Sequence, residues 1–332
     1  MYEQSIGWLL EPDLENPGVR YFTLRDLIKL SEYDPQLLAA RREVMESGSV
    51  PRILAAQTAN GWWELAGPGY YPKYTGTVWS VILLALIGAD GKDRRVQAGC
   101  EHLLEHSRSS YGGFSADGAP GGMIHCLQGN LAAALLDLGY GDDNRLQAAL
   151  DWLIRSITGQ GIAPPEDKQA VPRYYRSGNC APGFACSANN GQPCAWGAVR
   201  AMLALGKLPP GQRSPAMQAA IQTGVDFLLS VDPATAGYPS GFSDKPSRSW
   251  FQLQATPLGY VTDLLLILEA LVALGYRDDP RLANALDWLH SKAGPDGRWK
   301  QEYTFNGKTW SDIEVKGQPS KWVTLRALRV LL

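Results

Sequence analysis

The sequence lacks an excess of charge of either sign. Its 31 Lys and Arg residues face 33 Asp and Glu residues, which gives a formal net charge of -2. Acids and bases are interspersed along the chain, so no basic face of the kind that binds nucleic acid or an anionic membrane surface is expected. We therefore expect no nucleic-acid partner.

The sequence also lacks long apolar runs and a positively charged N-terminal segment. The longest apolar run, Val78–Gly88, is about half the length that a membrane-spanning helix needs, so it predicts a buried helix and no stable membrane insertion. The first residues, Met1–Glu11, place acids around a short apolar run and do not resemble a secretory signal. We expect a cytoplasmic protein.

One turn recurs with changes along the chain and is the strongest signal in the sequence. Its copies are Gln57–Trp63, Tyr111–Phe114, Gly237–Phe242 and Pro295–Trp299. Each copy follows an amphipathic stretch, and its Gly allows the backbone to reverse while its aromatic side chain packs back onto the preceding helices. The pattern is typical of a helical repeat protein.

The repeats also predict helical hairpins whose two helices differ in kind. The first helix of each is apolar nearly all round and should be internal, whereas the second alternates charge with Leu and Trp and should face water. The predicted inner helices are Thr77–Ile87, Ile124–Leu138, Ala195–Leu205 and Val261–Leu274, and clear outer helices are Leu146–Ile157 and Leu282–His290. Acids before the outer helices, including Asp143 and Asp279, should act as N-caps.

The two ends of the chain resemble each other. Val19–Leu27 and Ser320–Leu328 both order a basic residue, an aromatic and Thr-Leu-Arg, which indicates two more inner helices. Because an open solenoid needs polar end caps and this chain finishes on apolar residues, we expect the stack to close. The prediction is an all-α fold, a single α/α toroid over residues 1–332, with about six inner and five to six outer helices and a central cavity at one end.

A small β-hairpin is expected before the last helix. Between Trp299 and Lys321 aromatic and polar residues alternate around Asn306-Gly307, a pair typical of tight hairpin turns. Such a hairpin could cover the cavity and present Asp312 or Glu314 as a catalytic acid, or it could merely seal the ring.

These residues resemble the terpenoid-cyclase and protein-prenyltransferase toroid superfamily. Gln57-x3-Gly61-x-Trp63 matches its glutamine-tryptophan repeat. A bacterial and archaeal branch of prenyltransferase/squalene-cyclase repeat proteins is similar over nearly the whole chain, including Asn16–Arg25, Cys126–Asn130 and Gly317–Leu328. The resemblance implies a toroid that binds an isoprenoid or other apolar small molecule in a central aromatic-lined cavity. If the protein is an enzyme, it would transform that molecule there.

The chain departs from that superfamily in its chemistry. It has no Asp-x-Asp-Asp acid of class II cyclases, the nearest segment being Ser311–Glu314, and no aspartate-rich helices for diphosphate-bound magnesium. Two alternatives therefore stay open: a non-catalytic, zinc-stabilised toroid that binds a ligand or peptide, and a carbohydrate-active α/α barrel with paired carboxylates. The sequence does not specify an oligomeric state.

Four cysteines are candidate zinc ligands. Cys180, Cys186 and Cys194 lie in an irregular stretch before an inner helix, and Cys126 lies where another inner helix begins. Four thiolates could bind zinc tetrahedrally, and the alternative is a set of buried free thiols. His125, beside Cys126, could be a ligand, a general base or a core histidine.

The remaining candidates lie early in the inner helices. Asp263 is an N-cap by position, but in a cavity mouth flanked by aromatics it would have a raised pKa suited to proton donation. The resemblance places the N-terminal ends of the inner helices at that mouth. The aromatic side chains expected to face a ligand there are Trp79, Trp196, Tyr260 and Trp322, with His125 beside them.

Overall fold

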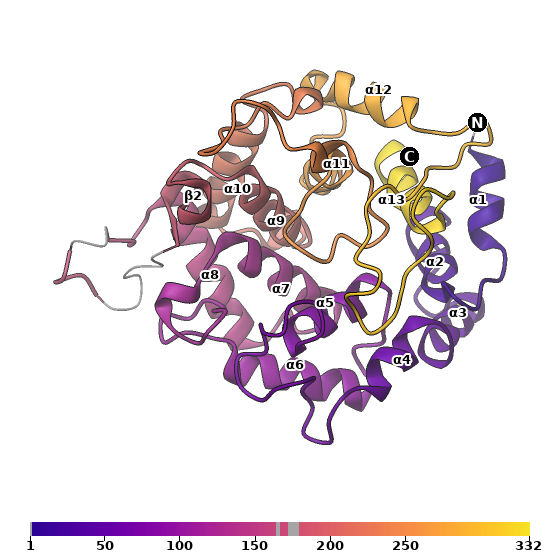
Figure 1. Ribbon diagram of the computed structural model, residues 1–332, viewed down its shortest axis with the longest axis horizontal. Coiled ribbons are helices and arrows are strands. Elements are labelled where there is room, and N and C mark those ends of the chain that lie inside the picture. The colour runs from indigo at the N-terminus through magenta and orange to yellow at the C-terminus, as the bar shows by residue number, and fades with distance from the viewer. Residues whose placement is uncertain (1, 164–166, 172–178) are drawn as a thin grey trace.

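Six helices form an inner ring in the computed structural model, which describes residues 2–163, 167–171 and 179–332. From the second inner helix to the sixth, contacts run in chain order from one to the next, and the sixth contacts the first. Figure 1 shows these helices around a common centre. They are α2 (Pro17–Phe22, extended by a π-helical turn over Thr23–Leu27), α5 (Thr77–Leu86), α7 (His125–Asp137), α9 (Ala195–Gly206), α11 (Leu264–Ala273) and α13 (Lys321–Leu331).

An outer layer of helices surrounds this ring. It consists of α1 (Glu3–Leu10), α3 (Pro35–Glu46), α6 (Arg94–His106), α8 (Asn144–Thr158), α10 (Pro215–Leu228) and α12 (Ala283–Ser291), with the short α4 (Ser49–Ala55) between α3 and α5. In α5 nine of ten residues are buried, as its apolar sequence predicts. The outer helices are amphipathic, and the predicted N-caps are confirmed: Asp143 and Asp279 accept hydrogen bonds from the backbone of Arg145 and Arg281. The all-α toroid prediction is confirmed.

Each copy of the recurring turn lies between a helix of the outer layer and the next inner helix. The indole N–H groups of Trp63 and Trp299 each donate to the backbone carbonyl ten residues earlier, in Ile53 and Leu289, at 2.7 Å. Their own backbone N–H groups donate to Thr77 and Thr324 on the following inner helices. In these two copies the tryptophan therefore links the preceding helix to the following one.

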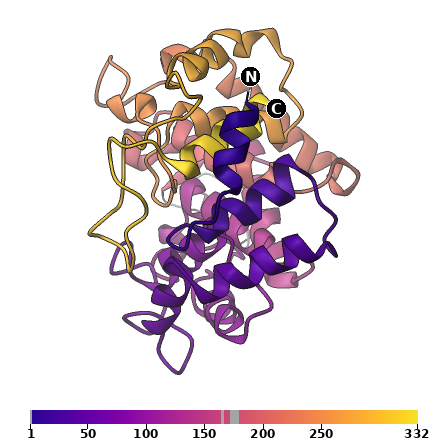
Figure 2. The ribbon, with the colours of Figure 1, turned by 90° about the vertical axis from the view of Figure 1, so that its right-hand side faces the viewer.

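The ring closes between α2 and α13. Their Phe22 and Trp322 rings pack edge to face with centroids 6.0 Å apart, and the Trp322 indole donates to Asn16 Oδ1 at 3.0 Å. Arg329 of α13 pairs with Asp26 at 2.5 Å. Helix α1 packs outside α13, so the first helix completes the last hairpin, and both views place the chain ends side by side (Figures 1 and 2).

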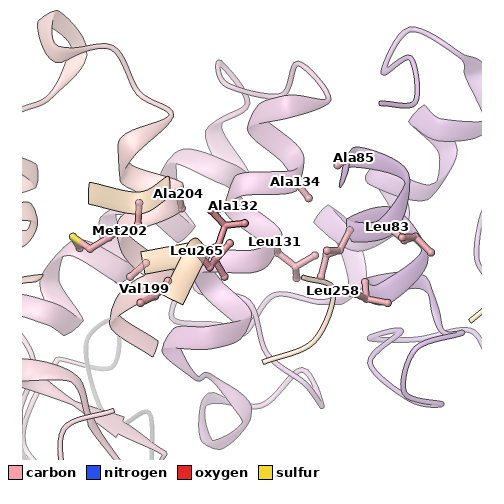
Figure 3. Close-up of a cluster of buried hydrophobic side chains, with 14 of the residues drawn as sticks. Leu83, Ala85, Leu131, Ala132, Ala134, Val199, Met202, Ala204, Leu258 and Leu265 are labelled. Atoms are coloured by element: carbon pink, nitrogen blue, oxygen red, sulfur yellow. The ribbon is translucent and has the colours of Figure 1, made fainter. Parts of the chain in front are cut away.

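Buried side chains of helices α5, α7, α9 and α11 meet in the core. Figure 3 shows Leu83 of α5, Leu131 of α7, Val199 of α9 and Leu265 of α11 in one cluster. Gly129 lets α7 approach α9, because a Cβ there would lie 2.2 Å from the Arg200 carbonyl carbon. Among the described residues, no helix combines the length and apolar character that crossing a bilayer requires.

The segment before the last helix differs from the predicted hairpin. An antiparallel bridge between Lys300 and Pro319 joins its ends, and Gly307 supplies the expected turn at a φ of 74°, but no strand pair forms between them. The Gln301 amide donates to the Ile313 carbonyl and Asn306 bonds to Glu314, so side chains replace the ladder. Within the described residues the two-stranded hairpin lies elsewhere, at β1 (Cys180–Ala181) and β2 (Ala185–Cys186).

Ring closure predicts opposite effects for two glycine substitutions. A Cβ on Gly18 would lie 2.2 Å from the Ile87 carbonyl oxygen and 2.8 Å from the Trp322 ring, whereas nothing lies within 4 Å of one on Gly7 in α1. We expect Gly18→Ala to lower the free energy of unfolding by about 1–3 kcal/mol, and Gly7→Ala to raise it by about 0.5–1 kcal/mol. Urea denaturation measures both, and an unchanged stability for Gly18→Ala would contradict the closed ring.

Candidate functional site

A cavity of about 350 Å³ lies at the centre of the ring. All six inner helices line it, mostly through their second halves, as the positions of Leu86, Asp137 and Lys207 show. The resemblance places the cavity mouth at the first turns of these helices. The cavity lies toward the opposite end of the ring.

The wall of the cavity is aliphatic rather than aromatic. Of its 24 lining residues, Phe22 and Trp322 are aromatic, and Ala, Leu, Ile, Val, Pro and Gly make up most of the others. The expectation of an aromatic-lined pocket is therefore wrong for this cavity. The apolar lining consists of Phe22, Ile82, Ala85, Leu86, Gly129, Ala133, Ala134, Leu203, Ala255, Pro257, Leu266, Val272, Ala273, Trp322 and Val330.

Aromatic side chains gather instead where the inner helices begin. The Trp79 ring packs against Tyr70, Tyr74 and Tyr260 at centroid distances of 5.2 to 5.6 Å, and its indole donates to the Tyr70 carbonyl. Phe305, from the segment before α13, adds to this cluster. Trp79 and Tyr260 thus pack against protein, as does Trp196, whose ring lies 6.3 Å from that of Trp250. Of the predicted ligand-facing aromatics, Trp322 lines the cavity.

Charged side chains on the inner helices also line the cavity. Arg326 of α13 is buried and donates to both carboxylate oxygens of Glu269 on α11, the shortest bond being 2.6 Å. It also contacts Asp263 at 3.4 Å. Burial alone would lower the pKa of Arg326, but the two carboxylates outweigh this effect and raise it.

Arg200 of α9 is the second buried arginine in the wall, with 3% of its surface exposed. Its guanidinium donates to the backbone carbonyls of Pro257 and Val261 at 2.8 and 3.1 Å. Burial lowers the pKa of Arg200 to about 10, so the group remains charged at neutral pH.

The rim carries three further ion pairs. Asp26 lies between Arg25 and Arg329, and Lys207 pairs with Asp137 at 2.7 Å. Burial would raise the pKa of Asp26, but Arg329 and Arg25 together lower it. The side chains of Lys207 and Asp137 are about one-third exposed, so the cavity communicates with solvent at this rim.

The predicted catalytic acids occupy structural positions outside the lining. Asp263 is fully buried; it caps α11 through Leu266 N and accepts from Gln254 N. Asp312 is exposed and accepts from the backbone of Gly307. Glu314 caps α13 by accepting from Lys321 N and from the Ser320 hydroxyl. Their proposed role in catalysis stays a prediction.

The four candidate zinc ligands lie near one another. Cys180 and Cys186 are cross-strand partners, and the free thiol of Cys194 neighbours those of Cys186 and Cys126. The hydrogen bond to Cys126, followed by burial, raises the pKa of the Cys194 thiol to about 12. Among residues 2–163, 167–171 and 179–332, however, no group of three or more Cys, His, Asp or Glu side chains is arranged to hold a metal ion.

His125 adjoins these thiols but belongs to the core. It is 3% exposed, and its Nε2 lies 2.8 Å from the Ser156 hydroxyl. Burial lowers the pKa of His125 to about 4, and the ring packs on Phe184. The residue is a neutral, hydrogen-bonded core histidine at physiological pH.

Sequence reasoning missed the polar side chains that do line the cavity. Arg200 and Glu269 are each the single charged residue of an otherwise apolar inner helix, α9 and α11, whereas Arg326 and Asn130 lie in helices that carry other polar residues. An isolated charge at that depth is itself a signal, because burying it requires a partner or a polar cavity.

Glu314 generates a pH-dependent prediction. Burial raises the pKa of Glu314 from 4.5 to about 7. Because the folded pKa lies above the unfolded one, the carboxyl lowers stability progressively as pH rises from about 4.5 to 7. We expect the free energy of unfolding of Glu314→Gln, relative to the native chain, to rise across this window by up to about 3 kcal/mol. Denaturation at several pH values tests this, with the exposed Glu46→Gln as control; a difference that does not change with pH contradicts it.

The zinc prediction is tested by metal analysis of the purified protein. A site made of these cysteines would carry one equivalent of zinc that is lost in Cys194→Ser and retained in Cys100→Ser, whose thiol is buried on the outer helix α6. Absence of zinc from the native protein would end the prediction.

No protein-family model matches the chain. Among solved structures, it is similar to a variant of the type II terpene cyclase MstE from Scytonema in complex with geranylgeranyl dihydroxybenzoate, at 15% identity over 85% of this chain and 70% of that one, with a TM-score of 0.43. It is also similar to a polysaccharide lyase, at 16% identity over 98% and 93% of the two chains and a TM-score of 0.48. An unsaturated glucuronyl hydrolase specific for heparin matches at 10% identity over 95% and 83%, with a TM-score of 0.49. These likenesses assign no activity to the chain.

Proposed function

We propose that the protein binds a small molecule with an apolar body in its central cavity. The observation that carries the proposal is the cavity itself: about 350 Å³ of space lined by all six inner helices, with a mostly aliphatic wall. Pockets of this size and lining are typical of small-molecule sites. The apolar ligand implied by the family resemblance therefore fits the space, although its wall is not aromatic.

The ligand enters from the rim formed by the ends of the inner helices. At the other end, Tyr70, Trp79 and Tyr260 pack against one another. At the rim, Arg329 and Lys207 keep about a third of their side-chain surface exposed. An apolar chain would enter between these charges and bury its length against the aliphatic wall.

The charges of the cavity favour binding over proton transfer. Each carboxylate in the lining, Asp26, Asp137 and Glu269, already pairs with a cation. The lowered pKa of Asp26 keeps it ionised, whereas a general acid needs a raised pKa. A carbohydrate-active barrel would need one such protonated acid beside a free carboxylate, so these ion pairs favour the apolar ligand.

A series of straight-chain alcohols from butanol to decanol tests the proposal. We expect one-to-one binding whose free energy becomes more favourable by about 0.8 kcal/mol per added CH₂ until the cavity is full. Ala133 lines the cavity, so Ala133→Phe should stop this gain at a shorter chain. Isothermal titration calorimetry measures both effects.

The control is Ala219→Phe, which places the same ring on the exposed face of α10 and should bind as the native chain does. Absence of saturable binding across the series would contradict the proposal. So would a gain in binding free energy that stops at the same alcohol length in Ala133→Phe and Ala219→Phe.

A further inference from the structure

Arg200 is a buried cation in the cavity wall with incomplete bonding. Two of its nitrogens, Nη1 and Nη2, donate to the carbonyls of Pro257 and Val261. The Nε–H is buried and has no hydrogen-bond partner within the described part of the chain. A buried donor without an acceptor costs about 1–3 kcal/mol, so such a group calls for an explanation.

Arg326 is a second buried arginine in the same wall, and unlike Arg200 it has carboxylate partners. Both residues are about equally buried, at 3% and 4% exposure, and both line the cavity. Arg326 is held by Glu269 and also contacts Asp263, two carboxylates of the intervening helix α11. Across the described residues no salt bridge joins Arg200 to a carboxylate; it meets backbone carbonyls, which carry no net charge.

The balance of charges around the cavity also favours an anionic ligand. Among the residues that the structure describes, its lining contains five cations, Arg25, Arg200, Lys207, Arg326 and Arg329, and three carboxylates, Asp26, Asp137 and Glu269. Counting Asp263 behind the wall as a fourth carboxylate still leaves one positive charge in excess. The carboxylates lie in ion pairs with other cations, so Arg200 is the lining cation that no salt bridge among the described residues joins to a carboxylate. Arg329 also has a buried Nε without a hydrogen-bond partner in the described part of the chain, but it pairs with Asp26.

The chemistry of guanidinium selects the missing partner. Its planar N–H groups form a fork that matches the two oxygens of a carboxylate, and this bond is strong where water is excluded. A neutral hydroxyl offers one oxygen and no charge. The aliphatic wall beside Arg200, which includes Leu203, Leu266 and Ala133, suits an alkyl chain attached to such a group.

We propose that the ligand of the central cavity is an amphipathic carboxylate whose carboxylate group binds the Nε side of Arg200 while its apolar chain lies along the aliphatic wall. The inference rests on the proposed function and deepens it by naming the class of ligand. Arg200 is then the residue that distinguishes an acid from the alcohol of the same length.

Octanoate and octanol form the matched pair that tests this inference by calorimetry on the full-length protein. At pH 7 we expect octanoate to bind the native chain at least tenfold more tightly than octanol. Arg200→Met should abolish this preference while octanol still binds. The matched control is Arg213→Met, because Arg213 also donates to backbone carbonyls, those of Leu208, Gly206 and Ala273, but lies outside the cavity lining.

The outcomes separate the two proposals. If octanol binds and octanoate binds no more tightly, the carboxylate inference is wrong and the apolar cavity stands. A tenfold preference that survives in Arg200→Met also overturns it. If neither molecule binds the native chain, both the proposed function and the carboxylate inference are wrong.

Should Arg200→Met not fold, as judged by circular dichroism, Arg200→Lys replaces it. This variant keeps the charge without the planar fork, and the preference for octanoate must fall at least several-fold.

Discussion

The contact between α2 and α13 is the constraint on which the rest of the structure depends. A stack of helical hairpins buries the apolar faces of its internal members, but its two end faces need either polar caps or each other. Here Phe22 packs on Trp322, and Asp26 pairs with Arg329 across the junction. The first helix, α1, then serves as the outer partner of the last inner helix. Closure replaces the caps and creates the enclosed space at the centre.

The central cavity explains why buried charged residues occur on the inner helices. Arg200, Glu269 and Arg326 would each be costly in a solid core, yet each lines the cavity, and the last two neutralise one another. Removing one partner of a buried ion pair usually lowers the stability of the fold more than replacing both partners by apolar residues. The polar groups therefore belong to the cavity, and the aliphatic residues between them set its shape.

Much of the ring could be predicted from the sequence because its signals are local. Helical periodicity located the inner helices within a few residues of α5, α7, α9 and α11, and the similarity of the chain ends indicated closure. The centre could not be predicted in the same way. Which end of a ring holds the cavity depends on side chains from loops, such as Tyr74 and Phe305, which pack in the aromatic cluster. Ion pairs such as that of Arg326 and Glu269 join residues 57 positions apart, so local sequence patterns do not indicate them. The hairpin prediction placed the Gly307 turn correctly but not the strands, because Gln301 and Asn306 bond through side chains.

Native-state hydrogen exchange tests the closed ring most directly. In a closed ring no inner helix is terminal, so the amides of α2 and α13 should be protected with the same opening free energy as those of α7 and α9. In an open stack the end helices fray first, and protection declines toward both ends of the chain. Equal protection of the four helices is the result that this account predicts, and markedly weaker protection of α2 and α13 would contradict it.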